Sequence, residues 1–533
     1  MRPTRRQLLY GTGIAAAGVA GAAPFVWDAV KPAPAIPGGI AGANSHLGHR
    51  LRTGGFPAPT TTTRHDAVIV GSGIAGLACA YNLAKSGRND FLVLELEDHA
   101  GGNAHSGENS VSRYPWGAHY VPLLSEEAGD IKALFQDFGI ITGYDKGLPV
   151  YNPDYILNDP DERLFLEGRW QEGLVPMIGI QPADEAQYKA FLAAMEAFKT
   201  QRGRDGKRWF AIPMDTGSSD PETRALDAQT MKAWMLAQGY TSEPLHWFVN
   251  YGCRDDFGVP HDQISAYAGI HYFAARNGKA ANTAPDSVIT WPEGNGFLAH
   301  KLAAPVRDRI VPKALAYAVR ETGEGVEIDY WDDAQQASHR LIAKTAVLAT
   351  PRFITGRLLP RLAVSDFSYA PWAVANITLN ALPEGEGADL AWDNVIRNSD
   401  KLGYVVATHQ VPEMQPLKTV ITYYWPLTHK DPATARQEAL ARTYGEWQDL
   451  FLNELWRVHP ELRRAVAHMD VWLWGHAMIR PVPGFIWGPS RAAALRQSPP
   501  VFTAHSDMSG ISIFEEAYTH GLVAARNVLD YLT

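Results

Sequence analysis

The 533-residue sequence contains only two cysteines, which excludes a disulfide framework and a cysteine-based metal site. One of them, Cys79, lies in an alanine-rich helical pattern, so we expect it to be buried and not bridged to Cys253. The sequence also lacks a long basic run and has a net charge of −9, which argues against a nucleic-acid partner. Hydrophobic residues make up 46% and charged residues 20%, the balance of a globular protein long enough for two domains.

The N-terminal region lacks an apolar run strong enough to predict a membrane span. Residues 11–26 are apolar but diluted by glycine and alanine, as in the apolar part of a signal peptide. They follow Arg5 and Arg6, and this combination resembles a twin-arginine export signal. We therefore predict a signal peptide over residues 1–35, export by the twin-arginine translocation machinery, and a periplasmic or secreted protein. A disordered basic tail and an uncleaved membrane anchor are the alternatives.

The clearest motif is a glycine-rich turn between a short apolar run and an alanine-rich helical pattern. Residues 66–78 read DAVIVGSGIAGLA. The G-x-G-x-x-G spacing is formed by Gly71, Gly73 and Gly76. It predicts a strand, a tight turn and a helix, whose first N–H groups, at Ile74 and Ala75, would bind a pyrophosphate. A second apolar run, 91–94, ends at Glu95, whose carboxylate can bind both ribose hydroxyls. This favours a bound dinucleotide over the alternative, a ligand-free βαβ unit.

The residues after Glu95 bear on which dinucleotide binds. Gly101 and Gly102 follow six residues after the acid, and Gly117 and Ala118 come later. This arrangement resembles the FAD-binding half of the flavin-containing amine oxidases and phytoene desaturases. In that family the Gly-Gly pair precedes an arginine, and a Gly-Ala pair passes beside the flavin ring. Here Asn103 replaces the arginine, which removes one charged contact to the pyrophosphate. A second G-x-G-x-x-G site for a nicotinamide is lacking.

Two later segments extend the resemblance. It implies that Asp507 lies at the ribityl and phosphate end of FAD, and that Ile513 and Phe514 begin a helix facing the flavin carbonyl edge. It also implies a backbone contact to the adenine, which we assign to Val319, the only valine of the predicted strand 316–320. Because no cysteine lies near Asp507, we expect noncovalent FAD.

The resemblance predicts an α/β fold, with a Rossmann-like FAD-binding domain and an interleaved α+β substrate domain. Residues 64–120, 290–355 and 495–533 are assigned to the FAD-binding domain, and 121–289 and 356–494 to the substrate domain. Residues 36–63, rich in Pro, Gly and Thr, read as a linker. The predicted helices include 185–199 and 231–238. The predicted strands include 325–330, 343–348 and 372–379.

Two catalytic candidates face the expected flavin. His119 follows the Gly-Ala pair, although a structural histidine explains it equally well. Many amine oxidases carry a lysine on a substrate-domain strand, where it holds a water near flavin N5. The resemblance places Asn376 there, which predicts slow reaction with oxygen. The pair Asp255 and Asp256 suggests metal or acid–base chemistry, but the neighbouring Arg254 and Gly258 favour a salt-bridged turn, and we predict no metal.

These features predict an exported FAD-dependent oxidoreductase that transfers hydride from a C–N bond of a small molecule, an amine, to flavin. A flavin desaturase or isomerase of an apolar, isoprenoid-like substrate is one alternative. A flavoprotein partner without turnover is the other. The substrate identity, electron acceptor and oligomeric state stay unknown at this stage.

Overall fold

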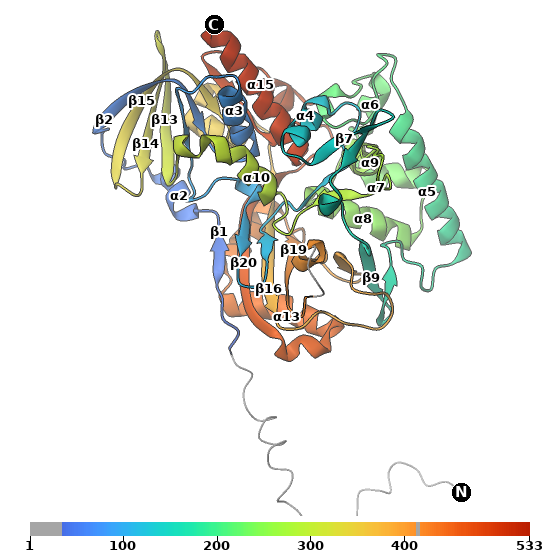
Figure 1. Ribbon diagram of the computed structural model, residues 1–533. Coiled ribbons are helices and arrows are strands. Elements are labelled where there is room, and N and C mark those ends of the chain that lie inside the picture. Colours follow the sequence, from blue (N-terminus) through green and yellow to red (C-terminus); the bar gives the residue numbers. More distant parts are fainter. Residues whose placement is uncertain (1–34, 412–415) are drawn as a thin grey trace, which may run out of the picture. The chain divides into compact units, whose positions relative to one another are not determined.

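Two β-sheets organise residues 38–533 (Figure 1). The computed structural model describes residues 35–411 and 416–533. The arginine pair and nearly all of the expected signal peptide lie outside the described residues. In the described part, no helix combines the length and the apolar character needed to cross a bilayer.

The first sheet has seven strands and carries the glycine-rich turn. Its strand order is β12-β3-β2-β15-β14-β13, and β21 pairs with β15. Strands β2, β3, β12, β15 and β21 run parallel, whereas β13, β14 and β15 form an antiparallel meander. The strands are β2 (Thr61–Val70), β3 (Phe91–Leu94), β12 (Ile310–Val311), β13 (Ala314–Thr322), β14 (Gly325–Asp332), β15 (Ala337–Leu348) and β21 (Val501–Thr503). A parallel sheet with crossover helices is the Rossmann-like architecture that the sequence predicts.

Two helices pack on this sheet and on each other. Helix α3 (Ile74–Lys85) follows β2, and α15 (Phe514–Leu532) ends the chain. They approach so closely that a Cβ on Gly521 would lie 2.2 Å from the carbonyl oxygen of Ala75. The apolar sides of both helices, including Cys79, Ala80, Ala524 and Val528, are buried against the sheet. This packing fixes the N-terminal ends of both helices relative to the strands.

The second sheet has eight mostly antiparallel strands in the order β1-β20-β16-β19-β18-β17-β9-β10. Two of its central strands, β16 and β19, are buried at almost every position, so both faces of the sheet are covered there. The strands are β1 (Ile40–Gly42), β9 (Glu162–Leu166), β10 (Arg169–Glu172), β16 (Tyr369–Leu379), β17 (Asp393–Ile396), β18 (Gly403–Val406), β19 (Thr419–Pro426) and β20 (Val466–Ile479). The domain boundaries stay a prediction.

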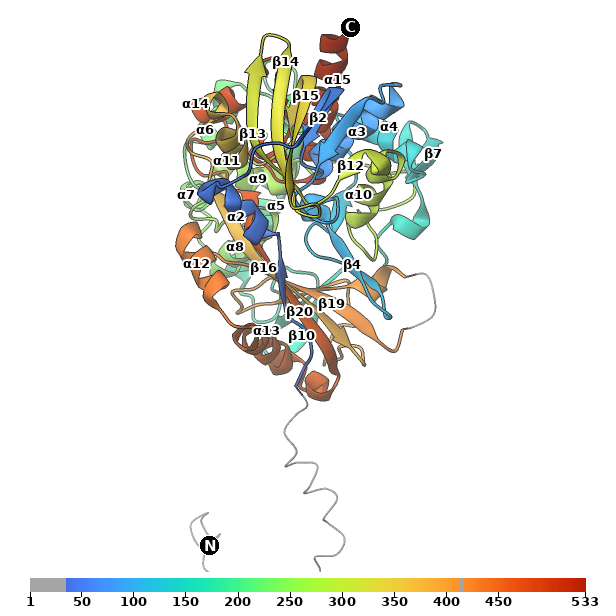
Figure 2. The same cartoon turned by 90° about the vertical axis from the view of Figure 1, so that its left-hand side faces the viewer.

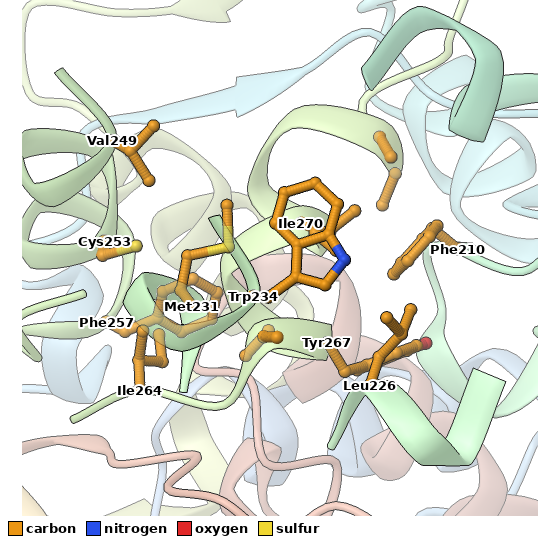
Figure 3. Close-up of a cluster of buried hydrophobic side chains, with 14 of the residues drawn as sticks. Phe210, Leu226, Met231, Trp234, Val249, Cys253, Phe257, Ile264, Tyr267 and Ile270 are labelled. Carbon is orange, nitrogen blue, oxygen red and sulfur yellow. The ribbon is translucent and has the colours of Figure 1, made fainter. Parts of the chain in front are cut away.

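A helical layer packs around the largest hydrophobic cluster (Figure 3). Met231, Trp234 and Phe257 point into it, and so does Cys253, which is free and buried like Cys79. The helices of this layer are α5 (Pro182–Thr200), α6 (Pro221–Leu226), α7 (Met231–Ala237), α8 (Glu243–Phe257) and α9 (Ala266–Ala274). The other helices are α4 (Gly129–Asp137), α10 (Gly296–Ala303), α11 (Arg352–Leu358), α12 (Pro432–Ala441), α13 (Tyr444–Val458) and α14 (Pro489–Ala494). Three two-stranded antiparallel sheets complete the fold: β4 (Ser106–Glu108) with β5 (Arg113–Pro115), β6 (Tyr120–Pro122) with β11 (Val288–Thr290), and β7 (Ile141–Asp145) with β8 (Leu148–Tyr151).

The stretch 36–63, expected to be a linker, is largely structured. It contains β1, helix α2 (Ser45–Thr53) and the start of β2. Strand β1 pairs in parallel with β20, and Gly39 N–H donates to Asp470 Oδ1 at 2.9 Å. The linker expectation is corrected here: β1 forms through a partner more than 400 residues away, which composition cannot show.

Candidate cofactor and active site

The glycine-rich turn forms a cradle at the end of β2. Gly71 adopts φ +100°, and Gly73 is the N-cap of α3. A Cβ on Gly76 would lie 1.9 Å from the carbonyl oxygen of Gly71, so a side chain there is sterically excluded. A Cβ on Gly73 would meet only Gly102 Cα, at 3.9 Å. Gly73 therefore borders open space at the start of α3, where the first N–H groups, such as those of Ile74 and Ala75, have no carbonyl partner within their own helix, as a pyrophosphate site requires.

Glu95 is held at the end of β3 by the same turn. Its Oε2 accepts hydrogen bonds from the backbone N–H of Ser72 (2.7 Å) and from Ser72 Oγ (2.6 Å). Its Oε1 accepts from the backbone N–H of Glu97 at 2.9 Å. Each carboxylate oxygen can accept more than one hydrogen bond, so this anchoring leaves capacity for ribose hydroxyls.

Asp507 lies at the other end of the cradle and is fully buried. Its Oδ2 accepts from the backbone N–H of Arg352 (2.8 Å) and the hydroxyl of Tyr369 (2.6 Å). Burial raises its pKa, but His505 and these two donors outweigh burial and lower the pKa, so the group is ionised at neutral pH. Its Oδ1 lies 3.1 Å from His505 Nδ1. Because a carboxylate oxygen can accept more than one hydrogen bond, Asp507 can also accept one from a hydroxyl group of a ribityl chain.

Asn103 and the Gly117-Ala118 pair join the cradle to a cavity. Asn103 Nδ2 donates to the carbonyl oxygen of Ala477 on β20 at 2.5 Å, and its own carbonyl accepts from Ala118 N–H at 3.0 Å. Three consecutive carbonyls of residues 115–117 accept hydrogen bonds from the eight-stranded sheet. Their donors are Asn376 Nδ2 (3.0 Å), Trp474 Nε1 (2.7 Å) and the Tyr424 hydroxyl (2.9 Å). The second sheet therefore fixes the loop expected to face the flavin.

The cavity beyond this loop has an empty volume of about 1000 Å³, counting its opening. Aromatic residues of the second sheet form one side, and the start of α15, at Ile513 and Phe514, forms another. The polar lining residues are Asn103, His119, Tyr120, Asp255, Asp256, His271, Arg276, Asn295, Tyr424, Ser512 and Glu515. In the described part, the structure holds no cluster of three His, Cys, Asp or Glu side chains suited to a metal ion.

Asp255 and Asp256 lie on helix α8 and face this cavity, which corrects the expected salt-bridged turn. Asp256 Oδ1 pairs with Arg276 Nη2 at 2.5 Å, and the Arg276 guanidinium lies 4.4 Å from the centre of the Tyr272 ring. Arg254 faces elsewhere and donates to the carbonyl oxygen of Asp400 at 2.8 Å. Within the described residues, Asp255 has no hydrogen-bond or ion-pair partner. One of the two carboxylates is thus neutralised and the other is free.

Burial changes the protonation of the cavity's acids. It raises the pKa of Asp255 to about 7, with the nearby Asp256 acting in the same direction. Burial likewise raises the pKa of Glu515 to about 8. Glu515 Oε1 has no hydrogen-bond partner in the described residues, although the side chain is almost fully buried. Both groups therefore titrate near neutral pH, where they can exchange protons.

Comparisons with known proteins agree with this geometry. A model of the NAD(P)-binding Rossmann-like domain matches residues 69–138. An L-amino acid dehydrogenase from Synechocystis sp. is 25% identical over 55% of this chain and 57% of its own length. An all-trans-retinol 13,14-reductase from Danio rerio is 43% identical over 15% of this chain and 13% of its own length. The chain thus spans about half the length of the dehydrogenase and a much smaller part of the reductase.

The structure of putrescine oxidase bound to putrescine superposes on 88% of this chain and on 100% of its own, with a TM-score of 0.62 and 16% identity. This chain has an amine-oxidase-like fold. The predicted α/β architecture with a Rossmann-like domain is confirmed.

In this amine-oxidase-like fold, His119 lines the cavity. Its ring stacks on Tyr424 with centroids 4.8 Å apart, and its Nδ1 lies 3.4 Å from the carbonyl oxygen of Gly117. Burial lowers its pKa to about 4, so the imidazole is neutral at neutral pH. A proton on Nδ1 would leave Nε2 as an acceptor toward the cavity.

Asn376 lies beside the cavity and is absent from its lining. Its amide nitrogen donates to Pro115, and its Oδ1 accepts from Thr422 Oγ1 at 2.6 Å. Both polar ends are thus used within the protein, so the geometry gives Asn376 a positioning role in place of the expected catalytic one.

Val319 does not lie where the adenine contact was expected. At the start of β13, the N–H of Ala314 donates to the Glu95 carbonyl at 2.7 Å. Val319 lies five residues after Ala314 on β13, where it pairs with Ile328. At the rise per residue of a strand, the two positions are roughly 16 Å apart. A backbone contact needs no particular side chain, so the distance to Glu95 favours the start of β13 over Val319, and the adenine contact itself stays a prediction.

Proposed function

We propose that this chain is an FAD-dependent oxidoreductase that oxidises the C–N bond of a small amine. The observation that carries the proposal is a dinucleotide cradle that opens, at Gly117 and Ala118, into a cavity lined by Asp255, a carboxylate without an ion-pair partner in the described residues. The amine-oxidase-like fold, which the chain shares with putrescine oxidase, supports it. FAD, when bound, would accept the hydride from the carbon next to the nitrogen.

Asp255 would recognise the substrate by charge. An ammonium group entering a low-dielectric cavity needs an anion, and Asp256 is already occupied by Arg276. An amine must also lose its proton before its C–H bond is oxidised. A carboxylate whose pKa is about 7 can accept that proton at neutral pH.

The walls of the cavity would exclude water and hold the substrate's carbon chain. Trp372, Tyr424 and Trp474 come from three adjacent strands of the second sheet. The start of α15 opens onto the same space, where its dipole favours negative charge. Noncovalent attachment of FAD is part of this proposal, and flavin should be released by heat or acid.

An anaerobic bleaching screen tests the proposal. Small amines should bleach the flavin of the purified protein, and Asp255→Asn should slow bleaching by roughly a hundred- to ten-thousandfold while retaining its flavin. Asp262→Asn is the matched control, because Asp262 is exposed and outside the cavity lining. Bleaching by amines at equal rates in all three proteins would contradict the role of Asp255.

A second candidate is a desaturase or isomerase acting on an apolar C–C bond. The aromatic walls and the short match to a retinol reductase favour it. In the same screen, isoprenoids would then bleach the flavin or be rearranged themselves, whereas amines would have no effect. A flavoprotein partner without turnover would respond to neither class.

We also propose that the chain is exported by the twin-arginine route to the periplasm or beyond. This route moves folded proteins, which suits a chain whose cofactor is noncovalent. The arginine pair Arg5 and Arg6, before a weakly apolar run, is the basis of the proposal.

A further inference from the structure

Four basic side chains lie near one another beside the cradle, and among the described residues none of them forms an ion pair. We call them the basic cluster: His49 and Arg52 of α2, Arg436 of α12 and His476 of β20. Arg436 Nη1 donates only to carbonyl oxygens, those of Tyr369 (3.3 Å) and Gly475 (3.1 Å). Within the described residues, neither His49 nor Arg52 has an ion-pair partner. Like charges at close range repel, so a cluster of this kind is suited to a bound anion.

The charges of the cluster act on one another. Burial first, and then the charges of Arg436, Arg52 and His49, lower the pKa of His476 to about 4. Burial also lowers the pKa of Arg436, with Arg52 acting in the same direction. Asp431 is the one acid that opposes this effect on Arg436, and its Oδ1 already caps α12 by accepting from two backbone N–H groups. The cluster is therefore under-neutralised.

Helix α2 is anchored to the loop that follows the ribose acid. The backbone N–H of Asn44 donates to Glu97 Oε1 at 2.8 Å, and Glu97 N–H in turn donates to Glu95. Leu47 is buried against Leu315 and Trp331. Figures 1 and 2 show α2 between the lower end of the seven-stranded sheet and the second sheet, next to β1.

The other side of the cluster adjoins the middle and far end of the cradle. His476 precedes Ala477, which accepts the hydrogen bond from Asn103. Arg436 binds the carbonyl of Tyr369, and the hydroxyl of Tyr369 binds Asp507. A dinucleotide that lies from Glu95 past Gly73 to Asp507 would therefore run alongside the cluster.

We propose that Arg52 and Arg436 bind the phosphates of the dinucleotide and supply the positive charge that Asn103 lacks. The N-terminal segment 38–58 is then part of the cofactor site. This inference rests on FAD binding, as proposed above, and not on which substrate is oxidised. The competing explanation is local: basic residues in the last turn of a helix stabilise that helix through its dipole.

Titration of the apoprotein with FAD separates the two explanations. Arg52→Gln should raise the dissociation constant for FAD by roughly ten- to hundredfold, the range of one charge-assisted hydrogen bond. Arg50→Gln is the matched control, because Arg50 is in the same turn but its guanidinium lies over Trp331 at 4.3 Å and over Phe56 at 4.7 Å. It should change the dissociation constant less than about twofold.

Charge restoration gives a second measurement. Adding Asn103→Arg to Arg52→Gln should recover most of the lost FAD affinity, because it returns a positive charge to the cradle. Equal FAD affinities for Arg52→Gln and Arg50→Gln, or no recovery with Asn103→Arg, would overturn the inference. A wild-type protein that binds no flavin at all would instead refute the proposed function.

Discussion

Replacing Gly73 tests the cradle most directly, because this position separates cofactor binding from folding. Gly73 has φ −64° and ψ 177°, an extended conformation open to any residue. A Cβ there would meet only one atom, Gly102 Cα at 3.9 Å. The apoprotein should therefore tolerate Gly73→Val, and its unfolding free energy should change by less than about 1 kcal/mol.

The effect on FAD should be large. A valine side chain would fill the space in which the N–H groups at the start of α3 bind the pyrophosphate. Loss of two charge-assisted hydrogen bonds costs about 3–6 kcal/mol, which is roughly a hundred- to ten-thousandfold in the dissociation constant. Purified Gly73→Val should therefore be colourless, whereas the unmodified protein should be yellow.

Flavin absorbance per chain, FAD titration and thermal unfolding of the apoprotein measure these quantities. Gly143→Val serves as the control, since a Cβ on Gly143 of β7 also meets no atom within 4 Å but is not part of the cradle. Gly76→Ala should behave oppositely to Gly73→Val and destabilise the apoprotein, because its Cβ would collide with Gly71. Full flavin content in Gly73→Val would refute the placement of the pyrophosphate.

Four further predictions follow from the charges, the positioning contacts, the asparagine in place of a lysine, and the export signal. Burial raises the Asp255 pKa from 3.8 to about 7, so the folded protein holds a proton that the unfolded chain releases above about pH 4. Between pH 4 and pH 7 the unfolding free energy of the unmodified protein should thus fall on the order of 4 kcal/mol more than that of Asp255→Asn. Identical pH dependence of thermal unfolding in the two proteins would contradict this. Asn376→Leu leaves Pro115 and Thr422 without their hydrogen-bond partner and should cost about 2–4 kcal/mol of unfolding free energy. Stopped-flow mixing of the reduced, unmodified protein with oxygen should show slow flavin reoxidation. Fast reoxidation would count against that prediction. Replacing Arg5 and Arg6 by lysine should retain the protein in the cytoplasm, as cell fractionation would show, and unchanged export would refute the signal.

The parts of the fold set by local chemistry were predictable from sequence. The strands expected at 325–330 and 343–348 lie within β14 and β15, and the helix expected at 185–199 lies within α5. In the G-x-G-x-x-G turn, Gly76 meets the carbonyl oxygen of Gly71, five residues earlier, and the spacing of the motif reveals this contact. Gly71 itself meets the backbone of Ala349, which follows β15, and the spacing of the motif does not reveal that contact.

The acidic pair shows why sequence neighbours can mislead. Gly258 suggested a turn around Asp255 and Asp256, but it is the left-handed C-cap that ends helix α8, with φ +64°. Successive residues on a helix point about 100° apart, so Arg254 cannot share a face with the acid beside it. The partner of Asp256 is Arg276, which follows α9 and lies twenty residues away. Only the packing of α8 against α9 brings these charges together at the cavity.

At position 103, too, contacts between distant parts of the chain decide what a residue does, here beside the cofactor. The sequence shows that an arginine expected beside the pyrophosphate is asparagine, and no neighbour of Asn103 in the chain supplies the charge. In the structure, Asn103 instead joins the cradle to β20, and β20 also pairs with the N-terminal strand β1 that precedes α2. The compensating Arg52 is thus brought in by a segment whose composition resembles a linker. Its effect on FAD affinity, measured against Arg50, will show whether that segment belongs to the cofactor site.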